Sequence, residues 1–248
     1  MRHTERALLG CFLLAIATVS KAGLIADSLS EFSSTQGQDS WRYGFFNAGA
    51  APGAAYTSGD FVAFDTFDVA ATRWAASAAQ VGSQNNIFLS LDSAGGHPNG
   101  IGPDAQDSII WAVRRYTSEV AGVIDLNYHL RKRNISNPNG GGITGHIFVD
   151  GVELLDQFIA NLDGIGTQGV LSVAVNVGTL IDFAIDPTGT TSARDPSIHN
   201  ARADGTDFTA RILTHEISEP DTGWLVLASC LGIGCLRRYF VDRTVVEQ

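Results

Sequence analysis

The stretch LSVAVNVGTLIDFAID, residues 171–186, decides the fold of this chain. Apolar residues occupy every second position from Leu171 to Val177, and the same alternation returns from Ile181 to Ile185. A period of two puts alternate side chains on one face of a β-strand. Gly178 and Thr179 separate the two runs. The stretch therefore predicts two strands joined as a hairpin, each with one buried face.

A second hairpin is predicted over residues 147–154. Two apolar runs flank Asp150-Gly151, and this dipeptide tolerates the positive φ angles that tight hairpin turns require. Residues 123–130 are predicted to form a strand whose buried stripe is Ile124, Leu126, Tyr128 and Leu130. Further strands are expected at residues 61–67, 87–91, 111–116 and 208–213.

The rest of the chain repeats this pattern of short strands. Loops rich in Gly, Asn and Asp separate them, the longest being NISNPNGGG at residues 134–142. Long amphipathic helical runs are missing from the sequence, and no repeat or linker divides residues 23–216. These features predict an all-β protein with a single jelly-roll-like β-sandwich domain at residues 23–216.

The first 22 residues have the composition of an export signal. Arg2, His3 and Arg6 precede an apolar run at residues 7–19, and Ala22 completes a small-x-small site with Ser20. A basic start, an apolar run of this length and such a site are typical of a signal peptide cleaved by signal peptidase, here after Ala22. The alternative is a buried N-terminal helix.

The C-terminal residues 217–248 form a second signal-like segment. Residues 224–236 are apolar and measure about 20 Å as a helix, whereas a bilayer core is about 30 Å thick. Arg237 and Arg238 end the run, as basic residues do on the cytoplasmic side of a membrane. We expect a transmembrane or sorting helix at residues 222–236 with a basic stop at 237–238. A buried core helix is the alternative.

The triplet before this run identifies the kind of signal. Ser218-Glu219-Pro220, then Leu-, Gly- and Ala-rich apolar sequence, then the arginine pair, resembles the PEP-CTERM sorting signal of exopolysaccharide-producing bacteria. Ser218 stands where that family has its first proline. The resemblance implies export, anchorage in the inner membrane through the C-terminal helix, and cleavage near the triplet by an exosortase-type protease. The product then lies at the cell surface or outside the cell.

The body resembles a jelly-roll, lectin-like module of secreted bacterial proteins. The resemblance supports the sandwich fold more than any one ligand. Five segments carry it: FSSTQGQDSWRYGFF (32–46), HPNG (97–100), AVRRYTS (112–118), GHIFVDG (145–151) and VGTLIDFAIDP (177–187).

Charge and cysteine content exclude some classes of protein. The formal net charge of −10 and the sequence pI of about 4.9 argue against a nucleic-acid partner, because phosphate binding needs clustered Lys and Arg. The one basic cluster, residues 131–133, is predicted to be a solvated strand end. All three cysteines lie in the terminal segments, so the stability of the body comes from core burial and not from disulfides.

Sugar recognition needs an aromatic face with hydrogen-bonding side chains beside it. Trp41, Arg42 and Tyr43 supply these residue types in one polar stretch, and His97 and Asn99 supply more in a Gly-rich loop. These five residues are the predicted ligand-binding set. The alternative is that Trp41 and Tyr43 belong to the core.

Several carboxylates are candidate calcium ligands. Asp182 and Asp186 share one face of a predicted strand, and Asp195 follows in a loop. Hard cations prefer oxygen ligands. However, no dense D-x-D-x-D-G loop is present, and an acidic solvated surface explains the same residues. No other cofactor is expected.

Catalytic motifs are missing from the sequence. A glycosidase needs two carboxylates about 5–10 Å apart, and Glu119, Glu153 and Glu216 can be nominated only by availability. No H-x-H, H-E-x-x-H or G-x-S-x-G spacing occurs. We expect a non-catalytic exported surface or matrix protein that binds polysaccharide. The alternatives are a secreted carbohydrate-active enzyme and a purely structural matrix protein.

Overall fold

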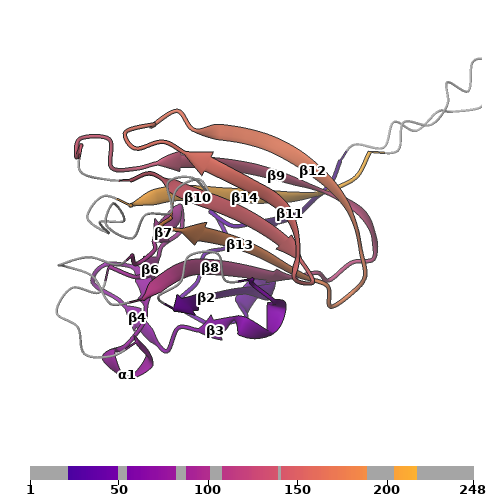
Figure 1. The fold of residues 1–248 in the computed structure, drawn as a ribbon. Coiled ribbons are helices and arrows are strands. Elements are labelled where there is room, and N and C mark those ends of the chain that lie inside the picture. The colour runs from indigo at the N-terminus through magenta and orange to yellow at the C-terminus, as the bar shows by residue number, and fades with distance from the viewer. Residues whose placement is uncertain are drawn as a thin grey trace, which may run out of the picture. The chain divides into compact units, whose positions relative to one another are not determined.

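Two antiparallel sheets hold nearly all the regular structure of the computed structural model (Figure 1). The larger, called the β9 sheet, has eight strands. Its strand β1 (Leu24–Asp27) pairs with β14 outside the main order. That order is β12 (Thr167–Val175), β9 (Gly122–Lys132), β14 (Thr206–Thr214), β7 (Gly95–His97), β6 (Ser90–Leu91), β5 (Arg73–Ala75) and β4 (Thr66–Asp68).

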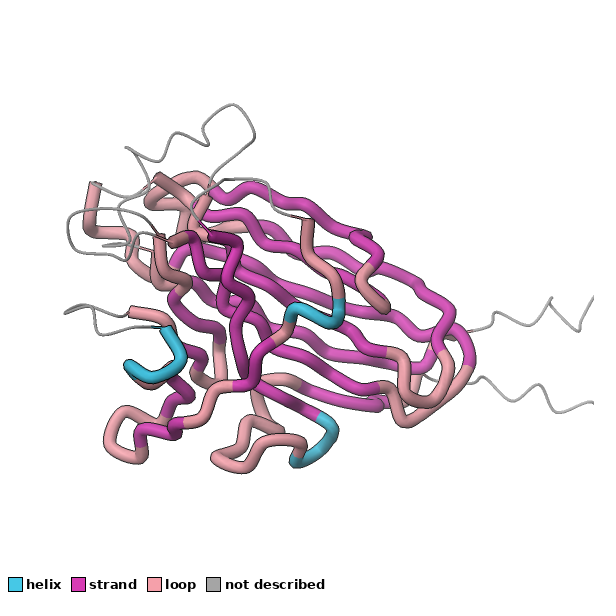
Figure 2. Tube along the Cα trace, turned by 60° about the horizontal axis from the view of Figure 1, so that its bottom comes forward, coloured by secondary structure: helices cyan, strands magenta, loops and turns pink. Residues whose placement is uncertain are grey.

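The smaller sheet, called the β10 sheet, has six strands. Figure 2 shows the strands running side by side, with loops gathered at their ends. The order in the β10 sheet is β11 (Val152–Ile159), β10 (Ile143–Val149), β13 (Leu180–Asp186), β8 (Ile109–Thr117), β2 (Trp41–Gly49) and β3 (Val62–Ala63).

Helix is confined to three single turns among the described residues: η1 (Gln38–Ser40), η2 (Ser58–Asp60) and α1 (Ala78–Val81). In those residues no helix is both long and apolar enough to cross a membrane. The structure describes residues 22–49, 55–81, 88–100, 108–138, 141–188 and 204–216.

The main core lies between the two sheets. Phe183 of β13 meets Phe208 of β14 edge to face, with ring centroids 5.7 Å apart, and Trp41 and Tyr43 of β2 are fully buried beside them. The predicted stripe of β9 faces this core, with Ile124, Leu126 and Leu130 buried and Tyr128 partly buried. The sequence therefore predicted an all-β, two-layer arrangement correctly.

A second apolar cluster covers the outer face of the β10 sheet. Phe46, Tyr56, Trp111, Val113 and Phe148 are each at most 6% exposed there. The inner face of this sheet is therefore buried, and its outer face is buried where this cluster lies. The outer face of the β9 sheet differs, because its alternate positions carry polar side chains such as Asp125, Asn127 and His129.

The hairpin predicted over residues 171–186 is wrong in its pairing. Both strands exist, but β12 pairs with β9 while β13 pairs with β10 and β8. The turn at residues 176–179 carries the chain from one sheet to the other. Alternation specifies which side chains face the core, and it carries no information about which strand lies alongside.

Other strand predictions divide in the same way. The hairpin over residues 147–154 is confirmed as β10 and β11, with Asp150 at φ 48° and Gly151 at φ 82°. Residues 111–116, 123–130 and 208–213 lie inside β8, β9 and β14. Residues 61–67 are not one strand, because β3 joins the β10 sheet and β4 joins the β9 sheet.

The two ends of the sandwich body lie side by side. Thr214 at the end of β14 accepts a hydrogen bond at Oγ1 from the Gly23 amide (2.7 Å), and its own amide donates to the Gly23 carbonyl (2.9 Å). Ala22, the predicted cleavage position, directly precedes this pair. Residues 1–21 and 217–248 lie outside the described residues, and with them the predicted signal helix, the sorting helix, Ser218, Glu219, Pro220, Arg237 and Arg238.

Candidate functional site

Trp41 and Tyr43 are core residues and do not form a sugar-binding surface. Each is 0% exposed. The Trp41 indole donates to Glu31 Oε2 (2.9 Å), and the Tyr43 ring stacks on Trp74 with centroids 6.1 Å apart. The prediction for these two rings is corrected. Odd positions of β2 face the neighbouring sheet, so the aromatic rings in that stretch turn inward.

The other predicted ligand residues are not gathered in one place either. Arg42 lies between the two buried rings and is exposed on the outer face of the β10 sheet. Asn99 is 0% exposed, and neither polar atom of its side chain has a hydrogen-bond partner. Its backbone forms a bridge with Ile110, which turns the residue into the body. Asn99 is therefore not a surface ligand.

His97 is partly buried and lies beside an aromatic ring that the sequence analysis did not select. Its imidazole packs on Phe88 with ring centroids 5.2 Å apart at 34°. Phe88 is 36% exposed. The His97 Nδ1 lies 2.6 Å from the Pro98 carbonyl oxygen. That contact fixes the ring at the end of β7, so the pair presents part of an aromatic face to solvent.

Charged side chains border this ring pair. Arg133 donates two hydrogen bonds to Asp92 (2.6 and 3.0 Å) and one to Asp207 (2.7 Å). A methyl group placed on Gly205 would lie 3.9 Å from both the His97 ring and the Arg133 side chain. The His97 ring and the stem of the Arg133 side chain therefore both lie beside Gly205. We call Phe88, His97, Asp92, Arg133 and Asp207 the Phe88 surface.

Electrostatics keep His97 neutral at pH 7. Burial lowers its pKa to about 4, and the charges of Lys132, Arg133 and Arg73 act in the same direction. Burial opposes ionisation of Asp92, but hydrogen bonds from Arg133 and from backbone amides outweigh it and hold the Asp92 pKa below its ordinary value. The Phe88 surface thus combines two aromatic rings with hydrogen-bonded pairs of Arg133 with Asp92 and Asp207.

The basic cluster at residues 131–133 lies at the end of β9 with Arg131 and Arg133 exposed, as predicted, but Lys132 is not solvated. Lys132 is buried against Asp204, with Nζ 2.8 Å from Oδ1, and burial lowers its pKa. Arg131 and Arg133 both pair with Asp207. Each cation already has a carboxylate partner, so the cluster is not a phosphate site.

The predicted calcium ligands are committed to other partners. Asp182 is 0% exposed and accepts hydrogen bonds from Arg115 (2.7 and 2.8 Å) and from the Tyr56 hydroxyl (2.7 Å). Asp186 accepts hydrogen bonds from the amide and hydroxyl of Thr188 (2.7 and 2.6 Å). Asp195 lies outside the described residues. Asp182 and Asp186, the two candidates that the structure describes, are therefore held by protein partners.

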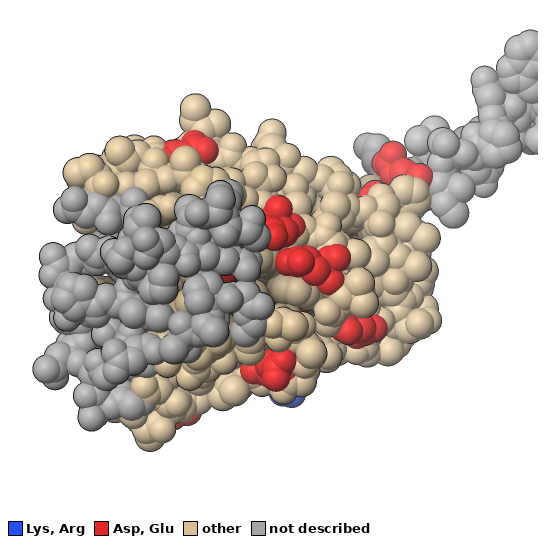
Figure 3. Space-filling view, viewed as in Figure 1, with Lys and Arg blue, Asp and Glu red and all other residues tan. Residues whose placement is uncertain are grey.

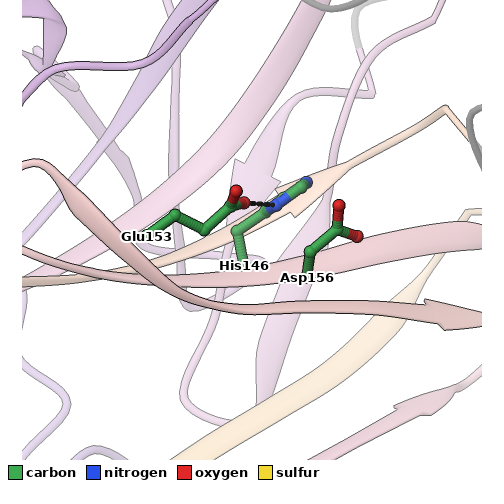
Figure 4. A group of neighbouring side chains, drawn as sticks. All are labelled: His146, Glu153 and Asp156. Carbon is green, nitrogen blue, oxygen red and sulfur yellow. Dashed lines mark hydrogen bonds and ion pairs between the residues drawn. The ribbon is translucent and has the colours of Figure 1, made fainter.

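A different cluster lies on the outer face of the β10 sheet (Figure 4). His146 Nδ1 is 2.6 Å from Glu153 Oε1, and one ligating atom each from His146, Glu153 and Asp156 lie within 4.8 Å of one another. Burial lowers the pKa of His146, but the carboxylates of Asp186 and Glu153 outweigh it and raise that pKa to about 9. The sequence analysis missed His146 and Asp156.

The carboxylates that we nominated for catalysis are not convergent. Glu119 accepts a hydrogen bond from the Ser40 hydroxyl (2.6 Å), whereas Glu153 belongs to the His146 cluster. In the parts of the chain that the structure describes, that cluster is the one group of ligating side chains that holds any of the nominated residues. Glu216 lies at the end of the described residues.

The similarity of this chain to known proteins is weak and was found among solved structures. No protein-family model matches the chain, and no curated protein matches it. Similar solved structures include the carbohydrate-binding module CBM51 from Clostridium perfringens in complex with methyl-galactose, at 14% identity and TM-score 0.29 over 48% of this chain and 81% of that one.

Two further structures illustrate the range. A family 35 carbohydrate-binding module from Clostridium thermocellum has 8% identity and TM-score 0.28, over 43% of this chain and 72% of that one. A β-glucosidase from Kluyveromyces marxianus has 10% identity and TM-score 0.33, over 88% of this chain and 21% of that one. The chain is thus similar, at low scores, to carbohydrate-binding modules of β-sandwich fold, and scores this low carry no argument about its ligand.

Proposed function

We propose that this chain is an exported, non-catalytic protein whose β-sandwich binds polysaccharide at the Phe88 surface. The observation that carries the proposal is the half-open ring pair of Phe88 and His97, which adjoins a fixed network of Arg133, Asp92 and Asp207.

The chemistry of this surface suits a sugar. The C–H face of a pyranose packs on an aromatic ring, and its hydroxyl groups need donors and acceptors beside that ring. Phe88 supplies the ring, Arg133 supplies donors, and Asp92 and Asp207 supply acceptors. Because the charged groups already hold one another, little side-chain freedom is lost on binding.

The position of the surface suits a protein attached through its ends. Thr206, at the start of β14, pairs with Gly96 next to His97, whereas Leu213, at the other end of β14, pairs with Leu24. The Phe88 surface and the two ends of the sandwich body, at Leu24 and Leu213, are therefore at opposite ends of β14.

Export and sorting belong to the same proposal. They rest on the signal-like residues 1–22 and on the PEP-CTERM-like residues 217–248, with signal peptidase and an exosortase-type protease as the processing partners. Intact mass of the protein recovered from cells tests both cuts. We expect loss of everything before Gly23 and loss of residues after the Ser218-Glu219-Pro220 triplet. A full-length polypeptide recovered from the cytosol contradicts export.

The binding test is a glycan array probed with the purified protein. Phe88→Ala removes the exposed ring, and we expect about 3- to 10-fold weaker binding to any glycan that the wild type retains. Val177→Ala is the matched control. Val177 is 69% exposed and follows β12, whose end pairs with Gly122 at the opposite end of β9 from Lys132. Equal losses in both variants contradict the proposed surface.

The two alternatives predict different results in the same preparation. A carbohydrate-active enzyme releases reducing ends from bacterial exopolysaccharide, and Glu153→Gln then abolishes that release. A purely structural matrix protein retains no glycan and releases none. Binding without release of reducing ends supports the proposal.

A further inference from the structure

A β-bulge in the β10–β11 hairpin places two carboxylates on the same face. Residues 153 and 156 are an odd number of positions apart, so in a regular strand their side chains point to opposite faces. The register shifts between Ile147 and Phe148: Ile147 lies opposite Leu155, but Phe148 lies opposite Glu153. The extra residue, Leu154, lets Glu153 and Asp156 share the outer face. Such bulges commonly re-aim side chains at functional sites.

His146 lies between these carboxylates on the neighbouring strand. It is directly opposite Asp156 in the register and is 2% exposed. The Trp111 indole stacks on its ring with centroids 4.7 Å apart and planes 4° apart, which fixes the plane of the imidazole. Figure 4 shows His146, Glu153 and Asp156 gathered above one sheet face, with Nδ1 joined to Glu153.

The other ring nitrogen faces a second, buried carboxylate. His146 Nε2 has no hydrogen-bond partner and lies 3.7 Å from Asp186 Oδ2. That distance is too long for a hydrogen bond, but it is within the range of an ion pair. Asp186 is 2% exposed and is anchored by Thr188. A histidine that binds a metal ion through one nitrogen usually donates the other N–H to such a carboxylate, which orients the ring.

We propose that His146 Nδ1, Glu153 and Asp156 form a binding site for a divalent transition-metal ion such as Zn²⁺ or Mn²⁺, with Asp186 as the group that orients His146. Imidazole and carboxylate ligands suit these ions, whereas Ca²⁺ prefers oxygen ligands alone. Three protein ligands leave at least one position open to water or to an external ligand.

The three ligating atoms need to approach one another by only a short distance to hold one ion. Ligands about 2.0–2.2 Å from a metal ion lie roughly 3 to 4 Å apart, whereas the three atoms here lie within 4.8 Å of one another. Glu153 and Asp156 are exposed on β11, while His146 is buried and stacked on Trp111. The ion replaces the proton between Nδ1 and Glu153, and that proton passes to solvent.

The electrostatic setting favours a cation. In Figure 3 the exposed acidic side chains gather on the side of the molecule where β11 runs in Figure 1, and basic atoms appear only at its lower edge. The net charge of the chain is −10. An acidic face of this kind raises the local concentration of cations before any ligand engages.

The test is calorimetric titration of chelator-treated, full-length protein with ZnCl₂ and with MnCl₂. We expect one ion per chain. Asp156→Asn removes a ligand and Asp186→Asn removes the group that orients His146, so we expect each variant to bind the ion at least about tenfold more weakly. Asp39→Asn is the matched control, because Asp39 is exposed on η1 and the variant makes the same change in charge. We expect its affinity to equal that of the wild type.

A second measurement avoids substitution at the buried histidine. Mn²⁺ is paramagnetic, so we expect substoichiometric MnCl₂ to broaden the NMR signals of the His146 ring before those of His97 and His129. The proposal is overturned if neither ion binds, if Asp156→Asn and Asp39→Asn bind equally well, or if His146 broadens no earlier than the other histidines.

Discussion

His97 and His146 are two shielded imidazoles with opposite electrostatics. Burial disfavours the charged form in both. Around His97 the neighbours are the cations Lys132, Arg133 and Arg73, and its pKa falls to about 4. Around His146 the neighbours are the carboxylates Asp186 and Glu153, which reverse the effect of burial and raise its pKa to about 9.

Burial acts in the same direction on both histidines, so the difference teaches that the charged neighbours decide in which direction each pKa moves. His97 is neutral beside Phe88, which suits an uncharged partner that packs on the rings. His146 is cationic when no metal ion is bound, and its surrounding carboxylates suit a metal ion in place of the proton. The same residue type thus has a lowered pKa at one place on the sandwich and a raised pKa at another.

The largest effect is expected from removing the Trp111 ring, which stacks on His146. Trp111 is 4% exposed and packs on Phe46 and His146. We expect Trp111→Ala to lower the free energy of unfolding by about 3–5 kcal/mol, as large-to-small changes at buried aromatic positions do. Urea unfolding of both proteins measures it.

Phe88→Ala is the counterpart at the other histidine. Because Phe88 is 36% exposed, we expect Phe88→Ala to lower the free energy of unfolding by about 1 kcal/mol or less. If Phe88→Ala lowers the free energy of unfolding as much as Trp111→Ala does, the distinction between a buried face and an open ring surface is lost.

The second test removes a carboxylate from His146. In metal-free Asp186→Asn we expect the His146 pKa to fall from about 9 by about one unit or more, because one of its two main anionic neighbours is gone. NMR titration of the ring protons measures this. A raised histidine pKa adds stability that is present below pH 6.5 and is lost as pH rises through 9. The variant should therefore lose less stability than the wild type across that window.

An unchanged His146 pKa in Asp186→Asn contradicts the role of Asp186, and the two histidines then differ for another reason. Circular dichroism of the variant checks that the sheets remain folded.

The smallest test concerns His97. Its pKa in the folded state, about 4, is below the ordinary 6.5, so the unfolded chain takes up a proton first as the pH falls. The contribution of His97 to the free energy of unfolding is fully present above pH 6.5 and is lost as the pH falls through 4. We expect His97→Gln to reduce that loss by on the order of 1 kcal/mol, measured by urea unfolding at pH 7 and pH 4.

Arg133→Gln sharpens the same test, because it removes one of the cations near His97. We expect a smaller acid-induced loss in this variant than in the wild type. A His97→Gln protein whose stability falls in parallel with the wild type at every pH contradicts the assignment.

Alternation was enough to predict the strands and their faces, but not their partners. The buried stripe of β9 follows directly from its sequence, and so does the Asp150-Gly151 turn. The pairing of β12 with β9 did not follow, because a turn of a few residues can lead either to the adjacent strand or across to the other sheet. The alternation also did not predict that Tyr56 and Phe46 belong to a cluster on the outer face of the β10 sheet.

The candidate site was predicted only in part. His97 was chosen and stays a prediction, Phe88 was not chosen, and Trp41 and Tyr43 were assigned to a surface when they belong to the core. A two-residue turn with regular pairing places Leu155 opposite His146. Only the bulge brings Asp156 there, and a bulge has no reliable signature in this sequence.

Sequence by itself determined the two-residue period of the body, the turn at Asp150-Gly151, and the signal-like composition of both termini, because each depends on a few adjacent residues. Tertiary structure alone decided that cations surround His97, that carboxylates surround His146, and that Asp182 is buried against Arg115. These arrangements join residues far apart in the chain. Their energies depend on which strands lie side by side, and local backbone preference does not specify that.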